Sequence, residues 1–329
     1  MKRKKKTVET RLYDGFAFYI DQPESQESAS LSLDVNIWVD DKSGCCIDFG
    51  ILLASYSDLR KLAMYIPFSV EPQEINDLYD CLAEPGVAQA VFNDDLYARN
   101  YGKYIKLMDK DGQINRIIMS IGSDFSLTRL ADNAVSQCDS GVTMRISPSC
   151  PKELTAEYKG QIYIRFRLPY KQLDQDMLTM RDYRGTVTTP FFRCNVASIL
   201  ALNERRNTPR CCWGDSLEYW RVGTIHYAIV ANDIWHIASN SAPYRVRTLE
   251  RNWSEYLPWQ KIKDSRRLLV YQYESLDAEK TTLYTEYSKQ VVNARSILFY
   301  CVALLFFGIL SEILNRLLLP SDFPHCLFG

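Results

Sequence analysis

Apolar residues recur at every second position in two stretches of the chain, and this period predicts half-buried β-strands. The first stretch is residues 31–39 and the second is residues 160–168. Strands place successive side chains on opposite faces, so one face of each predicted strand is apolar. The alternating apolar positions are Leu31, Leu33, Val35, Ile37 and Val39 in the first stretch, and Ile162, Ile164, Phe166 and Leu168 in the second.

The remaining apolar runs predict further strands and a few short helices. A polar turn at residues 40–44 and an apolar run at residues 45–53 complete a hairpin with the first strand. Other strands are expected at residues 114–121, 141–146, 223–230, 234–238, 244–248 and 268–273. Short helices are expected at residues 57–64, 71–82, 126–135 and 196–202, and a longer helical pattern begins at Leu276. The pattern therefore predicts an α+β fold, with β-rich antiparallel sheets and short helices, followed by one C-terminal transmembrane helix.

The last long apolar run decides whether the chain crosses a membrane. Residues 297–310 carry no charge, but a helix of that length measures only about 21 Å. The hydrocarbon core of a bilayer is about 30 Å thick, so a span requires the helix to continue over residues 296–319. The continuation places Glu312 and Arg316 near the far edge of the core, where their four-residue spacing allows them to pair. The alternative is a buried or interfacial helix at the C-terminus.

Flanking charges predict how this helix is oriented. Lys280, Lys289 and Arg295 precede the predicted span, whereas residues 321–329 contain no Lys or Arg. Cytoplasmic flanks carry an excess of these residues, so we expect a single-pass, tail-anchored protein whose large domain faces the cytoplasm.

The charge distribution suggests how that domain is organised. Residues 7–158 carry 12 Lys/Arg and 24 Asp/Glu, a net charge of about −12, while residues 159–270 carry 18 and 10, a net of about +8. Such asymmetry indicates two halves that attract each other or a basic face turned toward an anionic surface. The predicted divisions are a basic arm at 1–11, an acidic β-rich subdomain at 12–150, a basic β-rich subdomain at 151–273, a helical stalk at 274–295, the transmembrane helix at 296–319 and a short tail at 320–329.

Cysteines and histidines give little indication of a cofactor. The chain has 10 cysteines and 3 histidines, without the paired Cys-x2-Cys spacing of zinc sites. We therefore expect reduced cytosolic thiols, no metal and no cofactor.

Two predicted strands carry arginines that share a face. Arg165 and Arg167 flank Phe166, and Arg245 and Arg247 flank a valine. If the two strands are neighbours in one sheet, four guanidinium groups line one surface, and arginine forks suit phosphate or carboxylate groups. The four residues are a candidate site for an anionic small-molecule or protein ligand, and the alternative is a solvated face paired with the acidic half.

Residues suited to catalysis lack a recognisable motif. His226 and His236 flank a predicted hairpin, and His236 with Asp233 or Asp215 is a possible acid–base pair. The acidic residues Asp34, Asp40, Asp41 and Asp48 surround the first hairpin, but nothing in their spacing indicates a metal-dependent nuclease.

Three functional classes follow from these observations. The favoured class is a membrane-anchored binding or sensing protein, with lipids and an anionic ligand as expected partners. The first alternative is a membrane-perturbing effector in which the soluble domain oligomerises and the C-terminal helices associate through Glu312. The second alternative is a membrane-tethered hydrolase. Nucleic acid is not an expected partner, because no recognised motif accompanies the basic arm.

Overall fold

The computed structural model describes most of the domain and the C-terminal helix. The described residues are 15–20, 30–39, 45–84, 86–122, 125–129, 141–146, 160–170, 193–208, 218–258, 268–273, 281–290 and 294–318. The predicted basic arm, the turn containing Asp40 and Asp41, and the predicted tail lie outside them.

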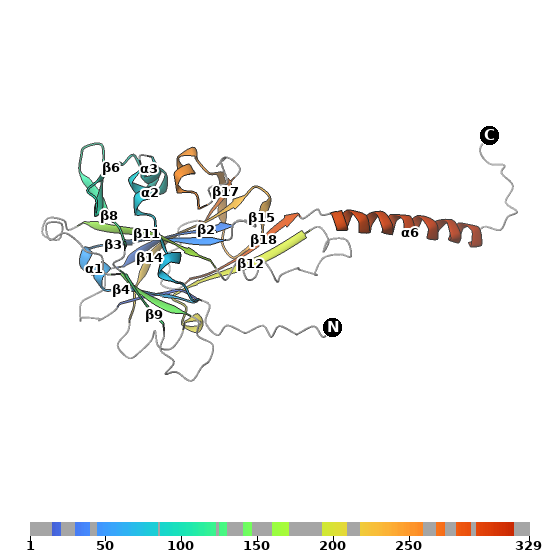
Figure 1. Ribbon diagram of the computed structural model, residues 1–329, viewed down its shortest axis with the longest axis horizontal. Coiled ribbons are helices and arrows are strands. Elements are labelled where there is room, and N and C mark those ends of the chain that lie inside the picture. Colours follow the sequence, from blue (N-terminus) through green and yellow to red (C-terminus); the bar gives the residue numbers. More distant parts are fainter. Residues whose placement is uncertain are drawn as a thin grey trace.

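A mixed ten-stranded sheet forms the centre of the domain (Figure 1). Most neighbouring strands are antiparallel, but β14 pairs parallel to β2 and β11 pairs parallel to β8. In spatial order its strands are β16 (Tyr244–Thr248), β17 (Leu268–Tyr273), β14 (Val222–Asn232), β2 (Leu31–Val39), β3 (Cys46–Leu53), β11 (Gln161–Pro169), β8 (Ile114–Met119), β7 (Tyr104–Met108) and β6 (Tyr97–Asn100), with β5 (Asn76–Asp77) beside β11.

Two smaller sheets complete the β structure of the described residues. The five-stranded sheet contains β13 (Glu218–Tyr219), β1 (Ala17–Ile20), β4 (Leu62–Ile66), β10 (Val142–Ile146) and β9 (Phe125–Arg129). The three-stranded sheet contains β12 (Arg193–Leu202), β18 (Thr281–Gln290) and β15 (Trp235–Asn240).

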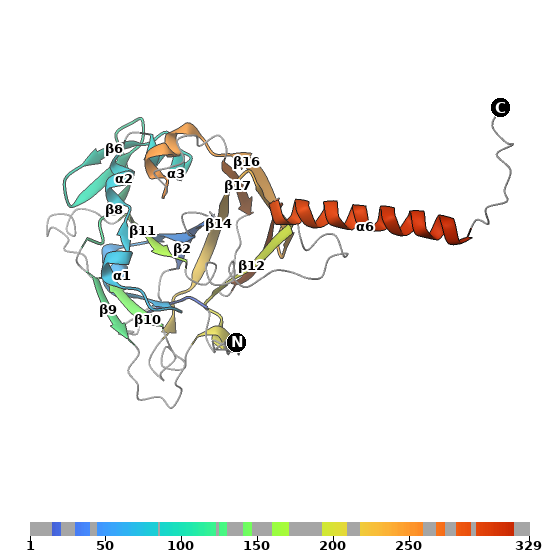
Figure 2. The same ribbon diagram turned by 45° about the vertical axis from the view of Figure 1, so that its right-hand side comes forward.

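The apolar faces predicted for residues 31–39 and 160–168 both point into the main core. Their alternating residues pack with apolar residues of the five-stranded sheet, such as Phe18 and Met64. The opposite face of the ten-stranded sheet carries a second cluster around Trp38, which packs with α2 (Tyr79–Ala83), α3 (Val87–Phe92) and the 3-10 helix η5 (Arg251–Tyr256). Figure 2 shows α2 and α3 on one side of the sheet and β10 and β12 on the other.

Five sequence predictions about secondary structure need correction. The helix expected at residues 57–64 is α1 (Tyr56–Arg60) followed by β4, and the helix expected at residues 71–82 is divided into the 3-10 helix η1 (Pro72–Glu74), β5 and α2. Residues 196–202 lie in β12 rather than in a helix, and residues 125–129 form β9. Thr281–Gln290, inside the predicted helical stalk, forms β18, which pairs with β12 along ten residues. Long-range pairing decides these segments, because strand preference depends strongly on cross-strand neighbours and burial. Residue 150 does not separate two sheets, since the ten-stranded sheet combines strands that precede and follow it.

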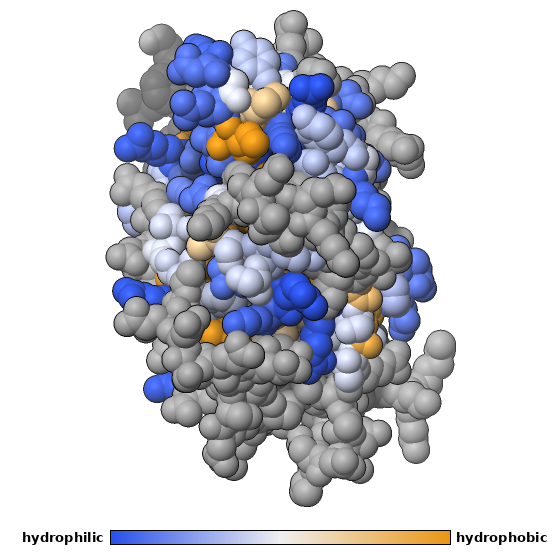
Figure 3. Space-filling view, turned by 90° about the vertical axis from the view of Figure 1, so that its left-hand side faces the viewer, coloured by the Kyte–Doolittle hydropathy of each residue, from blue (hydrophilic) through white to orange (hydrophobic). Residues whose placement is uncertain are grey.

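The C-terminal helix α6 (Ala294–Leu318) extends away from the domain (Figure 1). Its segment Ile297–Leu317 is long and apolar enough to cross a membrane, and none of this segment is buried against the domain. A core helix would bury its apolar side chains, so the exposed helix does not fit the alternative of a buried C-terminal helix. Figure 3 shows the side of the domain turned away from α6, where the coloured residues are mainly hydrophilic with isolated apolar patches.

Candidate functional site

A cleft of about 670 Å³ lies on the face of the ten-stranded sheet that α3 and η5 partly cover. Its floor contains polar side chains from β2, β14, β11 and β17. Its walls come from α3 and β8 on one side and from β16, η5 and the segment between them on the other. The residues that give it chemical character are Ser32, Asp34, Asn36, Phe92, Arg116, Tyr163, Arg165, Thr224, His226, Arg247, Glu250, Trp253 and Gln272. Binding sites combine such a concavity with a few convergent polar groups.

One row of the floor runs across four adjacent strands. His226 on β14 is opposite Asp34 on β2, Asp34 is opposite Gly50 on β3, and Gly50 is opposite Arg165 on β11. Residues opposite one another on neighbouring strands point to the same face of a sheet. The register therefore brings a histidine, a carboxylate and a guanidinium onto one line.

Gly50 is required for the contacts within this row. A Cβ atom at residue 50 would lie 2.0 Å from the hydroxyl of Tyr163 and 3.1 Å from Nη1 of Arg165. The missing side chain lets the Tyr163 hydroxyl cross β3 and donate to Asp34 Oδ2 at 2.8 Å. Arg165 Nη1 in turn donates to the Tyr163 oxygen at 2.6 Å and lies 3.8 Å from Asp34 Oδ2.

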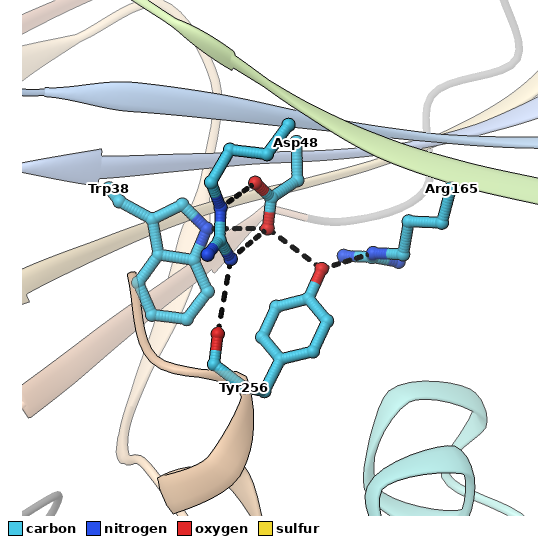
Figure 4. A network of polar contacts seen from close by, with 5 residues as sticks. Trp38, Asp48, Arg165 and Tyr256 are labelled. Carbon is cyan, nitrogen blue, oxygen red and sulfur yellow. Dashed lines mark hydrogen bonds and ion pairs between the residues drawn. The ribbon is translucent and has the colours of Figure 1, made fainter. Parts of the chain in front are cut away.

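Behind the cleft, the carboxylate of Asp48 is fully buried and accepts four hydrogen bonds (Figure 4). Arg167 donates from Nε at 2.6 Å and from Nη2 at 2.9 Å, Trp38 Nε1 donates at 2.7 Å, and the Tyr256 hydroxyl donates at 2.8 Å. Arg165 Nε donates to the same Tyr256 hydroxyl. Because Tyr256 belongs to η5, this network fixes the helix that forms one wall of the cleft.

The network holds its groups in fixed protonation states. Burial raises the pKa of the Tyr256 phenol well above its ordinary value of 10.0, an effect that Arg165 opposes and Asp48 reinforces. Burial alone would lower the pKa of Arg167, but the adjacent Asp48 outweighs this and raises it. These side chains therefore act as a neutral phenol and a permanent cation.

The donors of Arg165 are engaged by the protein. Nε and Nη1 donate to Tyr256 and Tyr163, and Nη2 donates at 2.6 Å to the Asn36 amide oxygen in the orientation of that amide that suits its neighbours. The side chain is 2% exposed. Arg165 therefore supplies positive charge to the cleft. Its nitrogens already donate to protein groups, so they are poorly placed to bind a ligand in a bidentate way.

The walls of the cleft supply aromatic rings and exposed charge. The Arg116 guanidinium stacks over the Phe92 ring at 4.3 Å, and Phe92 meets Tyr163 edge to face at 4.8 Å. On the opposite wall, Glu250 accepts from Trp253 Nε1 at 2.8 Å and pairs with Arg247. The wall cations thus stand beside flat aromatic surfaces.

The structure separates the four arginines predicted to form one anion site, although all belong to one sheet. Strands β17, β14, β2 and β3 lie between β11 and β16. Arg165 and Arg247 line the cleft, Arg167 is buried against Asp48, and Arg245 is exposed on β16. Joint anion binding by the four residues stays a prediction.

Sequence reasoning did not pair His226 with Asp34. These residues are distant in the chain, and only the parallel pairing of β14 with β2 places them opposite each other. The alternation around Asp34 did indicate that its side chain leaves the apolar face of β2. His236 lies on β15, outside the cleft lining.

The remaining residues with possible chemical roles are metal ligands, thiols and the charged pair on α6. In the part of the chain that the structure describes, no three His, Cys, Asp or Glu side chains converge as metal ligands. Cys45, Cys46, Cys81 and Cys301 are not joined in disulfide bonds there. On α6, Arg316 Nη2 lies 3.0 Å from Glu312 Oε1, so the two residues form an ion pair.

Comparison with protein-family models and with curated proteins finds no match to this sequence.

Proposed function

We propose that this chain is a membrane-anchored binding protein whose domain holds a small molecule in the cleft on the ten-stranded sheet that α3 and η5 partly cover. The observation that carries the proposal is the convergence of polar groups from four strands on the floor of one 670 Å³ concavity with aromatic walls. The exposed apolar helix α6 would anchor the domain in a bilayer, with the domain on the cytoplasmic side as the flanking lysines and arginines suggest.

The lining favours a ligand that combines a ring, an anionic group and a hydrogen-bond donor. Three arginines and two carboxylates line the cleft, so its formal charge is about +1 with neutral histidine. Phe92 and Trp253 offer surfaces for a ring. Arg116 and Arg247 are the wall cations suited to the anionic group, and Asp34 is the acceptor suited to the donor.

Small molecules that co-purify with the full chain in lipid nanodiscs test this proposal. Wild-type protein is denatured, and the released compounds are identified by mass spectrometry. Gln272→Trp fills the cleft from an exposed floor position, and Gln161→Trp makes the same change at an exposed strand position outside the lining. We expect one compound to be released from wild type and from Gln161→Trp but not from Gln272→Trp. Equal amounts from both variants, or no compound from any preparation, would contradict a ligand-binding cleft.

A second candidate function is hydrolysis in the same cleft. His226 and Asp34 face each other, and the adjacent pair on the same strands is Thr224 opposite Ser32. A hydroxyl, an imidazole and a carboxylate are the groups that nucleophilic hydrolysis requires. If the cleft is catalytic, His226→Ala should abolish turnover in a panel of ester and phosphoester substrates, while the control His236→Ala retains it. Absence of turnover by wild-type protein would reject this function.

A third possibility concerns α6 itself. Counted from Ile297, Glu312 lies about 22 Å and Arg316 about 28 Å along the helix, near the far edge of a core of about 30 Å. An ion pair there is costly to expose to lipid, and association of two α6 helices would shield it. This is the basis for the effector alternative, in which copies of the chain associate through α6.

A further inference from the structure

We propose that the turn between β14 and β15, with Ile234 at its exposed corner, rests in the headgroup layer of the membrane that α6 enters. This inference rests on the proposed anchoring by α6. It adds a second contact between the protein and the bilayer, which would restrict how the domain tilts.

The short connection between β18 and α6 keeps the end of the three-stranded sheet close to the bilayer. Strand β18 ends at Gln290 and α6 begins at Ala294. Four fully extended residue steps cover at most about 14 Å, and the three residues from Ala294 to Ile297 add about 4.5 Å of helix. Gln290 therefore lies within about 19 Å of the hydrocarbon core, whose headgroup layer is itself about 5–7 Å thick on each side.

The strand register places the turn beyond Gln290 on the membrane side. Trp235 on β15 is opposite Lys289 on β18, and the two strands are antiparallel. Continuation of this register sets Ile234 level with Gln290 and sets Asp233 one residue, or about 3.3 Å, further in the direction in which the chain leaves the sheet. Figures 1 and 2 both show α6 starting beside this end of the three-stranded sheet.

The side chains at this end suit the boundary between water and lipid. Ile234 is 45% exposed although it is apolar, and Lys289 Nζ lies 4.6 Å from the centre of the Trp235 ring. The Trp235 ring is itself buried, so Lys289 is the group of this pair that would meet the bilayer, where a lysine ammonium can reach the lipid phosphates. Asp233 is exposed on the same turn, so the contact should form on zwitterionic phosphatidylcholine and needs no anionic lipid.

A single exposed isoleucine is ordinary on a protein surface. The support for membrane contact is therefore the position of Ile234 beside the start of α6, and not its exposure alone. Ile114 on β8 is 39% exposed, almost the same as Ile234, but β8 lies on the side of the domain away from α6 (Figure 1). The residues coloured on the side turned away from α6 are also mainly hydrophilic (Figure 3). Ile114 is therefore a matched control for Ile234.

Photocrosslinking of the full chain in phosphatidylcholine nanodiscs tests the proposal. Three variants each carry p-benzoylphenylalanine at one position: Ile234, Ile114, or Leu305 in the middle of α6, which is 67% exposed. After irradiation, mass spectrometry quantifies the fraction of protein that carries a covalently attached lipid. We expect lipid adducts at positions 305 and 234, with at least a fivefold lower yield at position 114.

The three positions distinguish failure of the inference from failure of the anchoring. Adducts at position 305 but only background yield at position 234 would overturn the contact of the turn and leave the anchoring intact. No adducts at position 305 would overturn the anchoring and, with it, this inference. Equal yields at positions 234 and 114 would also overturn the inference, because lipid would then meet the domain without preference.

Discussion

Replacement of Asp48 by asparagine should lower the free energy of unfolding by about 3–5 kcal/mol, the usual cost of removing one partner from a buried ion pair. The substitution removes the charge that balances Arg167 and turns one acceptor atom into an amide nitrogen that faces donors. Four hydrogen bonds to a charged group would sum to about 6–12 kcal/mol at 1.5–3 kcal/mol each. This sum is an upper bound, because the bonds share one carboxylate and are not additive.

Urea unfolding of the full chain in detergent micelles, followed by tryptophan fluorescence, measures this effect. Asp95→Asn is the matched control, because Asp95 pairs with Lys110 at 2.8 Å while both side chains are about 70% exposed. We expect the control to leave the unfolding midpoint unchanged, since exposed pairs contribute little. If Asp48→Asn shifts the midpoint no more than Asp95→Asn does, the buried network does not stabilise the fold as argued.

The same substitution should loosen one wall of the cleft. Tyr256 connects η5 to Asp48 by the hydrogen bond of its hydroxyl, and Arg167 Nη2 donates to the Tyr256 carbonyl oxygen at 3.2 Å. Hydrogen–deuterium exchange of residues 249–258 should therefore accelerate in Asp48→Asn and not in Asp95→Asn. Unchanged exchange in this segment would show that other contacts hold η5 in place.

Three further changes test separate parts of the structure. Gly50→Ala should destabilise the domain by about 1–3 kcal/mol in urea unfolding, because its Cβ overlaps the Tyr163 hydroxyl; Gly223→Ala, whose nearest neighbour is a serine oxygen at 3.3 Å, should cost less. Burial raises the pKa of Tyr163 and Tyr256 above 10.0, so the folded state keeps protons that the unfolded chain loses. The contribution of these two tyrosines to stability should be constant below about pH 10 and then fall by up to about 1.4 kcal/mol per pH unit for each tyrosine. Glu312→Leu should remove growth inhibition on overexpression if α6 acts as an effector.

Each of these expectations has a contradicting outcome. A Gly50→Ala protein as stable as wild type would mean that the Tyr163 hydroxyl has room to move. A urea midpoint that stays flat from pH 9 to pH 11 would contradict protonated tyrosines in the folded core. Toxicity that persists in Glu312→Leu, or wild-type protein that is never toxic, would reject the effector alternative.

Local sequence pattern determined the features of this protein that depend on near neighbours. A period of two residues identified β2 and β11 and the face of each that packs in the main core, because alternate side chains of a strand share one environment. The apolar run that follows a polar turn identified β3. The apolar run and its continuation through Arg316 identified α6, because helix length and hydropathy are local properties. The spacing of Glu312 and Arg316 also predicted a pair that the helix forms.

Tertiary structure alone decided the strand order and register, and through them the candidate site. The same period of two fits any neighbouring strand, so nothing local indicates that β14 pairs with β2 and sets His226 opposite Asp34. The local sequence pattern also does not indicate that the missing side chain of Gly50 makes room for the Tyr163 hydroxyl. Arg167 looked like an exposed cation from its sequence context, yet it is buried against Asp48, 119 residues away in the chain. Its environment is decided by contacts between distant segments, which sequence periodicity does not encode.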